Sequence, residues 1–247
     1  EKGWWDDLMP QEKNNVRLAV FELSKEFKNK IYPLLTSTFG SEPRPGIDGD
    51  ERISVFIHQM GSEAGGYFRS GDVYSRFQYP ESNEREMVYL NSKYITTSLN
   101  KSFLAHEFLH LITANQKDLL RLTNEETWLN EARAEAAVTF LGYDTIYSGS
   151  NLERRLRAFV EKPDDSLTEW QNKESDYGVI NLFIQYLLDH YKVRILVDSL
   201  RSSKVGISSI NEALLKNGFR EDFSQIFTDW AITVLANDCS LGSKYCY

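Results

Sequence analysis

The sequence has little cysteine and little histidine, and the positions of both residue types restrict its chemistry. Of 247 residues, two are Cys and four are His. Cys239 and Cys246 lie close to the C-terminal end, and their spacing fits neither a CxxC zinc clip nor a redox motif. We expect them to close a small disulfide loop, in agreement with an exported protein; the alternative is a pair of reduced thiols. His58 and His190 are expected to be structural or surface residues.

Long hydrophobic runs and an excess of positive charge are also missing. No stretch approaches the ~18 consecutive apolar residues that mark a membrane-spanning helix, so we expect no transmembrane segment. The formal net charge of -8 disfavours nucleic acids and anionic membrane surfaces as partners. The chain begins at Glu1 instead of Met and shows no signal peptide, which we expect of a processed or trimmed form.

Two of the histidines lie in the run His106-Glu107-Phe108-Leu109-His110. On a helix, residues four positions apart differ by about 40° around the axis and about 6 Å along it. His106 and His110 can therefore direct their imidazoles at one metal ion, while Glu107 points at a different part of the same site. Zinc held by two His and a third ligand keeps a position open for water, and an adjacent carboxylate can take a proton from that water. The pattern predicts a zinc hydrolase with Glu107 as general base and then general acid.

The third zinc ligand is expected downstream, where a second helix can return to the first. Glu131 follows His110 by 21 residues, which leaves room for the first helix to end and for a turn. We assign Glu131 as the ligand, with Asn130 beside it as a supporting residue. Glu135 lies one turn later on the same face and is interpreted as an acceptor for the N–H of a zinc-bound imidazole. A solvated helix face is the alternative for Glu135.

The residues around these ligands narrow the choice of family. In zincins of the HExxHxxGxxH pattern a Gly and a third His follow, whereas Thr113 and Gln116 stand at those positions here. The Met-turn of those enzymes is excluded as well, because Met87 is the last Met in the chain. The zincins whose third zinc ligand is a glutamate remain as the candidate class. The segments HEFLH and WLNEARAE resemble the gluzincin peptidases, most closely the hyicolysin family, and the likeness extends from about Arg52 to Trp230.

The resemblance implies a thermolysin-like zincin that hydrolyses peptide bonds, with one zinc ion on His106, His110 and Glu131. Aminopeptidase gluzincins bind the substrate amine through a Gly-x-Met-Glu-Asn motif, which is absent here; the nearest Gly-rich stretch, Gly61 to Gly66, contains no such run. We therefore expect an endopeptidase that cuts within polypeptides. In gluzincins a strand near the zinc pairs with the extended substrate, and the segments 65–74 and 86–94 are the candidates for that strand.

Many gluzincins also place a Tyr or His on the far side of the scissile carbonyl. The match in this chain is Tyr177, ahead of an apolar helix. We interpret Tyr177 as held by the preceding Asp176 and given space by Gly178. The alternative is a tyrosine at a helix start with its hydroxyl in water.

The periodicity of apolar residues predicts an α+β fold with strands in the first half and helices through the rest. A helix is predicted over 10–39, with an apolar stripe made of Val16, Val20, Leu23, Phe27, Ile31 and Leu34. A buried strand is predicted over 52–59, a hairpin or irregular loop over 65–77, and a strand over 86–94. Further helices are predicted over 99–117, 125–141, 152–160, 177–190, 193–201, 207–217 and 222–237.

These elements are expected to form a single metallopeptidase catalytic domain over 1–247. Hydrophobic residues make up 41% of the chain, which is ample for a core. The small mixed sheet is expected in an N-terminal α/β sub-lobe of about residues 1–120, packed beside a mostly helical sub-lobe of about residues 121–247. Glu125 and Glu126 are expected on a solvated helix face, in a first turn capped by Thr123 or Asn124.

Other functions fit the same residues. A zinc aminopeptidase or a hydrolase of small amides would use the same ligand atoms, and a catalytically inactive binding or adhesion module would retain only the scaffold. A structural Ca²⁺ ion is unsupported, because Asp48 and Asp50 lack the rest of an EF-hand loop and are expected in a solvated turn. We expect an extracellular, cell-surface or periplasmic protein of bacterial origin whose partner is a polypeptide substrate.

Overall fold

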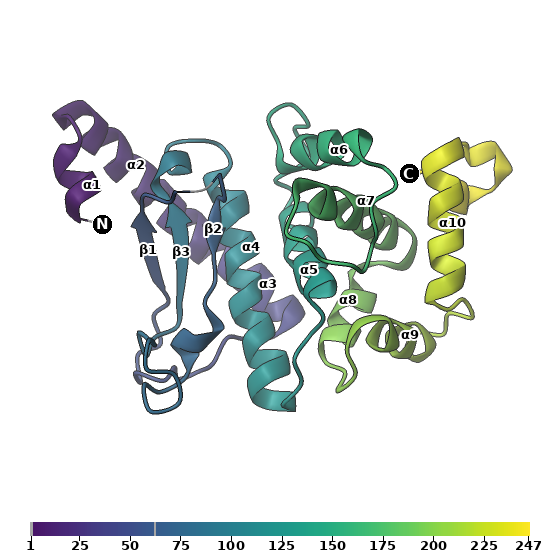
Figure 1. Ribbon diagram of the computed structural model, residues 1–247, viewed down its shortest axis with the longest axis horizontal. Helices are drawn as coiled ribbons and strands as arrows, with labels where there is room; N and C mark the ends of the chain where they lie inside the picture. The colour runs from purple at the N-terminus through teal and green to yellow at the C-terminus, as the bar shows by residue number, and fades with distance from the viewer. Residues whose placement is uncertain (1, 62) are drawn as a thin grey trace. The chain divides into compact units, whose positions relative to one another are not determined.

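The computed structural model describes residues 2–61 and 63–247 and divides into two compact units (Figure 1). The first unit comprises Glu1–Gln116 and Leu141–Asn151, and the second comprises Lys117–Phe140 and Leu152–Tyr247. Residues 141–151 follow α5 in sequence yet pack within the first unit, where the Tyr143 hydroxyl donates to Glu26 Oε1 at 2.9 Å.

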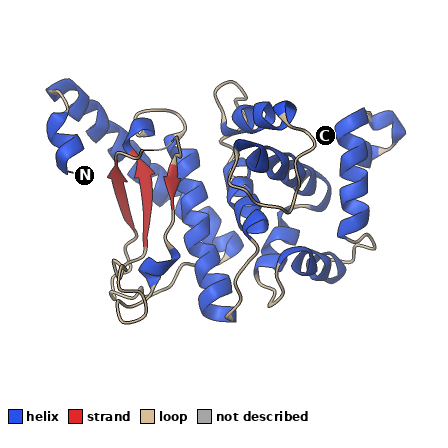
Figure 2. Cartoon of the chain, in the orientation of Figure 1, coloured by secondary structure: helices blue, strands red, loops and turns tan. Residues whose placement is uncertain are grey.

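The first unit contains a three-stranded mixed sheet, drawn in red in Figure 2. Its strands are β1 (Ser54–His58), β2 (Gly66–Tyr67) and β3 (Met87–Asn91), in the order β1-β3-β2. β1 pairs parallel with β3, and β2 pairs antiparallel with it. All five residues of β3 are buried, as expected of a central strand. The sheet together with the many helices confirms the predicted α+β fold.

The prediction that residues 52–59 form a buried strand is correct for the strand and wrong for its burial. β1 lies at the edge of the sheet, and Val55 and Phe56 are 37% and 42% exposed. An edge strand has a strand neighbour on one side only, so its side chains receive less cover than those of a central strand. β-branched and aromatic composition identifies a strand without telling where in the sheet it lies.

Helix α4 (Asn100–Thr113) packs against β3 and β2 and carries the HEFLH run. Nearly all of its residues from Ser102 onward are buried, because apolar side chains surround the polar ones on every side of the helix. The helix continues as a π-helical segment, Ala114–Leu119, which confirms the helix predicted over 99–117. The motif is therefore placed on a rigid element that is covered by the sheet.

The N-terminal helical region, after α1 (Lys2–Asp7), runs through α2 (Pro10–Glu26), a π-helical segment (Phe27–Ile31) and α3 (Tyr32–Phe39). This confirms the helix predicted over 10–39, but the predicted apolar stripe is only partly right. The fully or nearly buried positions are Val16, Leu23, Ile31, Leu35 and Phe39, whereas Leu34 is 41% exposed. The i→i+5 bonds of the π segment put more residues into a turn, so the buried face changes phase after it.

The second unit is helical. Its elements are α5 (Thr127–Phe140), α6 (Asn151–Glu161), α7 (Glu174–Tyr191), α8 (Val193–Leu200), α9 (Gly206–Lys216) and α10 (Phe223–Ala236). α5 packs along α7, and α8 packs against α9. Four fully buried alanines of α5, at 132, 134, 136 and 137, leave room for that close packing. All the predicted helices of this region are confirmed, with ends that differ by a few residues.

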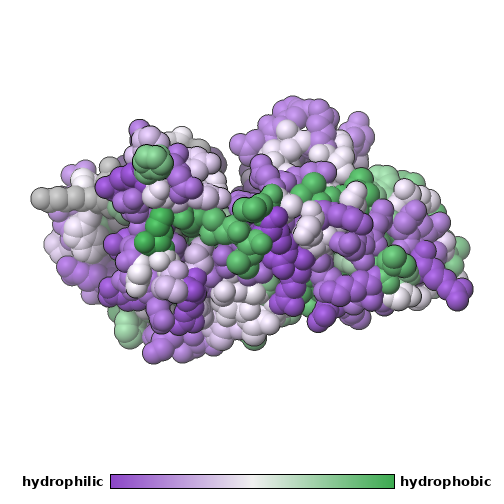
Figure 3. All heavy atoms as spheres, turned by 90° about the horizontal axis from the view of Figure 1, so that it is seen from below, coloured by the Kyte–Doolittle hydropathy of each residue, from purple (hydrophilic) through white to green (hydrophobic). Residues whose placement is uncertain are grey.

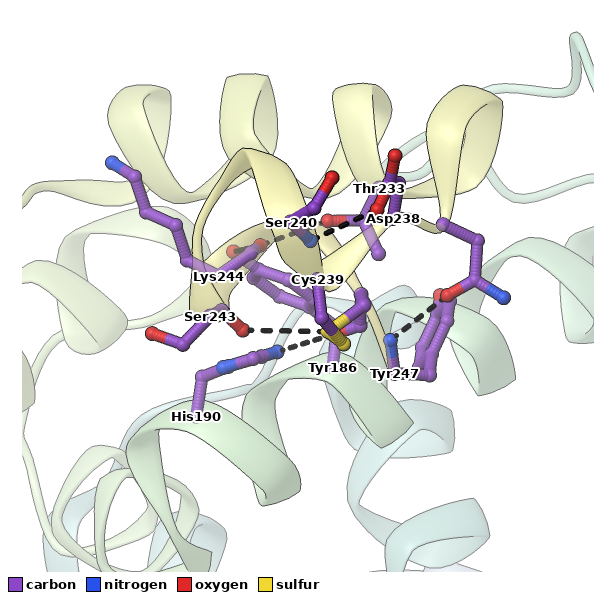
Figure 4. Close-up of a disulfide and its surroundings, with 11 residues drawn as sticks. Tyr186, His190, Thr233, Asp238, Cys239, Ser240, Ser243, Lys244 and Tyr247 are labelled. Carbon is purple, nitrogen blue, oxygen red and sulfur yellow. Dashed lines mark hydrogen bonds between the residues drawn. A yellow bond between two sulfur atoms is a disulfide. The ribbon is translucent and has the colours of Figure 1, made fainter.

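A disulfide closes the C-terminal segment into a loop, and hydrogen bonds attach this segment to helices of the second unit (Figure 4). Cys239 and Cys246 are joined, which confirms the predicted disulfide loop. The Trp230 indole donates to the Tyr247 hydroxyl at 2.8 Å, and the Tyr186 hydroxyl donates to the Lys244 carbonyl at 3.0 Å. The last residues of the chain therefore form part of the packed structure.

The surface shown in Figure 3 carries hydrophobic groups between larger hydrophilic areas. Within residues 2–61 and 63–247, none of the helices has the length and the apolar composition needed to cross a membrane.

Candidate metal site

The two histidines of the HEFLH run lie one turn apart on α4. Their ring centroids are 4.8 Å apart, and the rings are inclined at 78°. His106 and His110 are 9% and 8% exposed, and Glu107 between them is 6% exposed. Burying three polar side chains on an apolar helix is unfavourable unless they are hydrogen-bonded or bind a ligand. Their placement on α4 is that predicted from the spacing.

Strand β2 passes directly beside Glu107 because two consecutive glycines remove the side chains that would block it. A Cβ at Gly66 would lie 2.9 Å from Cγ and 3.1 Å from Oε1 of Glu107, and a Cβ at Gly65 would lie 2.4 Å from the Phe103 ring. Asn91 holds this segment in place, since its backbone N–H donates to the Gly65 carbonyl at 2.9 Å. In the sequence these glycines indicated only that an amine-binding motif is absent, because a close approach between a strand and a helix leaves no local sequence signal.

The third predicted ligand lies in the first half of α5. Glu131 is partly exposed, while Trp128, one turn earlier, is 1% exposed and anchors the start of the helix. The Trp128 indole N–H donates to Glu126 Oε2 at 2.6 Å. Asn130, predicted as a supporting residue, donates its backbone N–H to the Glu126 carbonyl at 3.0 Å. The bulky tryptophan thus fixes the turn of α5 that presents Glu131.

His106, His110 and Glu131 each offer one ligand atom, and these atoms lie within 4.8 Å of one another. The structure therefore brings together the three residues that the sequence predicted. Two imidazoles and one carboxylate are the donor set of many catalytic zinc sites with three protein ligands. The residues present fit a zinc ion.

Glu135 is fully buried, so the solvated helix face considered for it is wrong. Its Oε1 accepts from Arg155 Nε at 3.1 Å and from Arg155 Nη2 at 2.6 Å, and its Oε2 accepts from Asn181 Nδ2 at 2.8 Å. Burial opposes the charge on Arg155, but the Glu135 carboxylate outweighs it and raises the pKa of the guanidinium. Arg155 and Asn181 lie on other helices, so the sequence near Glu135 gave no signal for them.

Tyr177 lies in the first turn of α7 and is partly exposed. The guanidinium carbon of Arg155 lies 4.1 Å from the centre of its ring. The Trp170 ring meets it nearly edge-on, with centroids 4.8 Å apart at 75°. Contacts on two sides hold this ring, which is more restraint than a tyrosine projecting into water would have.

The neighbours of Tyr177 act differently from the interpretation based on sequence. Asp176 Oδ2 accepts the backbone N–H groups of Gln171 and Lys173 at 2.9 and 2.8 Å, so it fixes the start of α7 and not the tyrosine side chain. A Cβ at Gly178 would lie 2.6 Å from the backbone nitrogen of Phe159. Gly178 is therefore required for the close packing of α7 on α6, and its role is not to give Tyr177 space.

The prediction of a solvated face is wrong for Glu125, whereas Glu126 is exposed as predicted. Both residues precede α5, and the Glu125 side chain is 2% exposed. Glu125 Oε2 lies 2.7 Å from Arg133 Nη1 and 3.3 Å from Lys117 Nζ, and both of these cationic side chains are fully buried. Its Oε1 accepts the Gly206 N–H at 2.7 Å. Glu125 is the centre of a buried ion network, which acidic composition alone did not indicate.

The remaining two histidines have structural contacts, as expected. His58 Nδ1 lies 2.9 Å from the Gln59 carbonyl, and its Nε2 lies 3.3 Å from the Tyr67 hydroxyl. His190 Nε2 lies 3.0 Å from the Cys246 carbonyl (Figure 4). Neither is among the candidate metal ligands in the described part of the chain.

Asp48 and Asp50, which were expected in a solvated turn and not as calcium ligands, interact with arginines. Asp50 accepts from the side chain of Arg52 at 2.9 Å, and Asp48 lies 3.3 Å from Arg85. The Arg52 side chain lowers the pKa of Asp50 to about 2. These contacts agree with a surface turn and give no support to a calcium ion.

Comparison with known proteins finds a relative that is a metalloprotease by name. The chain is 31% identical over 191 residues to the neutral metalloprotease ShpI of Staphylococcus hyicus, an alignment that covers 67% of this chain and 41% of that protein. The chain therefore spans less than half the length of this relative. No family model matches the sequence. The relative bears the name of a metalloprotease, and the two histidines and one glutamate that converge in this chain are a donor set of the kind that binds zinc.

Proposed function

We propose that this protein is a zinc-dependent endopeptidase. The observation that carries the proposal is the convergence of ligand atoms from His106, His110 and Glu131, with Glu107 beside the first histidine on a rigid helix. The similarity to a neutral metalloprotease supports the same reaction class. Membership of the hyicolysin family, which the segments HEFLH and WLNEARAE suggest, is part of the same proposal.

Each residue of the site has a defined task in this reaction. When bound by the three ligands, zinc would act as a Lewis acid that polarises the peptide carbonyl and lowers the pKa of a water molecule. Glu107 takes a proton from that water while the water oxygen forms a bond to the carbonyl carbon of the substrate. Glu107 then delivers the proton to the leaving nitrogen as the C–N bond breaks. Its low exposure, 6%, keeps bulk water from competing for this proton.

Strand β2 is the candidate for holding an extended substrate. In the described sheet, β2 has β3 as its neighbour on one side only, so its other edge can pair with a polypeptide by main-chain hydrogen bonds. Gly65 and Gly66 bring this backbone within contact of Glu107. Pairing of this kind needs no free substrate amine, and together with the missing amine-binding motif it favours cleavage within chains over removal of N-terminal residues.

Tyr177 is proposed as the donor that stabilises negative charge on the former carbonyl oxygen. Glu135 is proposed to accept a hydrogen bond from a zinc-binding imidazole, with Asn130 and Asp176 as further supporting residues. The Cys239–Cys246 disulfide supports the proposal of an exported protein, because such bonds persist in oxidising compartments.

The test of the function is digestion of an N-terminally blocked peptide and a matched unblocked peptide, with fragments identified by mass. We expect both to be cut at internal bonds, and a chelator to stop the cleavage until zinc is restored. Cleavage of the unblocked peptide alone, one residue at a time, would replace the proposal with an aminopeptidase. Hydrolysis of small amides but of neither peptide would indicate a small-amide hydrolase, and no hydrolysis with bound zinc would indicate a binding module.

A further inference from the structure

We propose that Arg155 is a positioning residue, which joins Glu135 on α5 to Tyr177 on α7 and so holds both in the geometry that the reaction needs. The inference rests on the proposed zinc-peptidase function. It goes beyond that function by assigning a role to a residue that touches neither the proposed ligands nor the reacting atoms. All the contacts that support it lie within the second unit.

Arg155 is buried and makes oriented bonds. It is 5% exposed, and two of its nitrogens donate to the same oxygen of Glu135, at 3.1 and 2.6 Å. A third nitrogen donates to Glu174 Oε2 at 3.3 Å. Burying an ion pair gives little net stability compared with well-packed apolar residues, because both charges lose their hydration. A guanidinium kept in such a place therefore points to a requirement for orientation.

The same guanidinium supports the Tyr177 ring. Its central carbon lies 4.1 Å from the ring centre, so one guanidinium binds Glu135 through its N–H groups and also lies over the Tyr177 ring. Trp170 also contacts the Tyr177 ring, nearly edge-on, so two side chains restrain the tyrosine. A shift of Arg155 would consequently move both the carboxylate and the phenol.

The position of Glu135 explains why this matters to the site. Glu135 is one turn from Glu131 on α5, and Asn181 fixes its second oxygen at 2.8 Å. α6 and α7 together thus hold the residue that is proposed to orient a ligand imidazole. Residues that orient metal ligands typically change metal affinity or activity by about 10–100-fold when altered.

Replacing Arg155 with lysine distinguishes a role in orienting Glu135 and Tyr177 from a role in neutralising the charge of Glu135. Lysine keeps the positive charge but lacks the planar fork that makes two bonds in one plane and stacks on a ring. A role limited to neutralising Glu135 would tolerate Arg155→Lys, whereas a positioning role would not. Arg157→Lys is the matched control, because Arg157 lies on the same helix with a 73% exposed side chain and pairs with Glu153.

The experiment compares wild type, Arg155→Lys, Tyr177→Phe, the double variant and Arg157→Lys. Zinc affinity is measured by competition with a chromogenic chelator, and kcat and KM are measured on an internally cleaved peptide. For Arg155→Lys we expect zinc affinity to fall about 10-fold and kcat to fall about 10–100-fold, with little change in KM. Arg157→Lys should match wild type. The double variant should lose clearly less activity than the product of the two single losses.

Unchanged zinc affinity and kcat in Arg155→Lys would overturn the proposal, and so would losses that simply multiply in the double variant. A wild-type protein that neither binds zinc nor cleaves peptides would instead refute the proposed function. If Arg155→Lys melts below the assay temperature, Glu135→Gln takes its place, since it weakens the same contact from the other side. Its loss of kcat should again combine less than multiplicatively with that of Tyr177→Phe, and independent effects would contradict the coupling through Arg155.

Discussion

The two helices that carry the proposed zinc ligands are built in different ways. α4 places a polar trio among apolar side chains, and five consecutive residues contain the chemistry. In α5 and the segment before it, charged residues are buried with partners from distant segments: Arg133 with Ser199 and Glu135 with Asn181. The proposed catalytic motif is thus local in sequence, whereas the residues that support the other proposed ligand helix come from distant segments.

Glu107→Gln should have the largest effect, and it tests the α4 side of the comparison. The amide cannot accept the proton from water, so kcat should fall by about 10²–10⁴-fold. Folding and zinc content should remain, because the side-chain volume is kept and Glu107 is not a proposed ligand. Peptide hydrolysis and zinc content of the same sample check this; full activity would exclude Glu107 as the base.

Glu125→Gln tests the buried ion network beside α5 by its effect on the free energy of unfolding. It leaves Lys117 and Arg133 buried without the carboxylate that pairs with both. Removing one partner from a buried ion pair typically costs about 3–5 kcal/mol, so the free energy of unfolding should fall by that amount. Urea unfolding measures it, with Glu22→Gln in the exposed pair of Glu22 and Lys25 as the control. A loss below about 1 kcal/mol would mean that the network is no stronger than a surface ion pair.

Tyr177→Phe tests whether the second unit contributes to the reaction as well as to stability. The substitution removes only the hydroxyl, so folding and zinc content should not change. Loss of a donor to the developing oxyanion typically costs about 10²–10³-fold in kcat, with little change in KM. If turnover is retained, the donor is another residue, and Tyr143, Tyr147, Tyr67 or Tyr74 is tested next.

Asp118 should give the smallest effect, visible only in the pH dependence of stability. Burial, followed by the charge of Glu125, raises the pKa of Asp118 to about 6, from 3.8. Since the folded state holds the proton more tightly, this contribution to stability is complete below pH about 4 and is lost as pH rises to about 6. In Asp118→Asn the loss of folding stability between pH about 4 and about 6 should be smaller by about 1–2 kcal/mol. An unchanged pH profile of unfolding would contradict the assignment.

The residues that sequence reasoning placed correctly are those whose signal lies within a few positions. The spacing of His106 and His110 needs only helix geometry, and the apolar periodicity of the later helices needs only their own residues. Glu131 was found because its segment follows the motif at a distance that suits a returning helix. The cysteines paired because they are close in sequence.

Other features depended on partners or on backbone geometry that spacing does not reveal. Glu125 was predicted to be solvated because its cations, Lys117 and Arg133, lie 8 residues away on either side, where no short-range pattern joins them. Arg155 was missed because it lies 20 residues from Glu135. Leu34 was assigned to the buried stripe because a π-helical turn before it has no recognised sequence signal.

The central claim is that α4 and α5 together bind one zinc ion, and elemental analysis of the purified protein tests it most directly. The account predicts one zinc per chain after dialysis against metal-free buffer, and strongly weakened binding in both His110→Ala and Glu131→Ala. Glu22→Ala, which alters an acidic residue with a 62% exposed side chain that is not part of the cluster, should bind zinc as wild type does. A protein that contains no zinc and whose melting temperature is unchanged by added zinc would contradict the claim, as would zinc retained undiminished in His110→Ala.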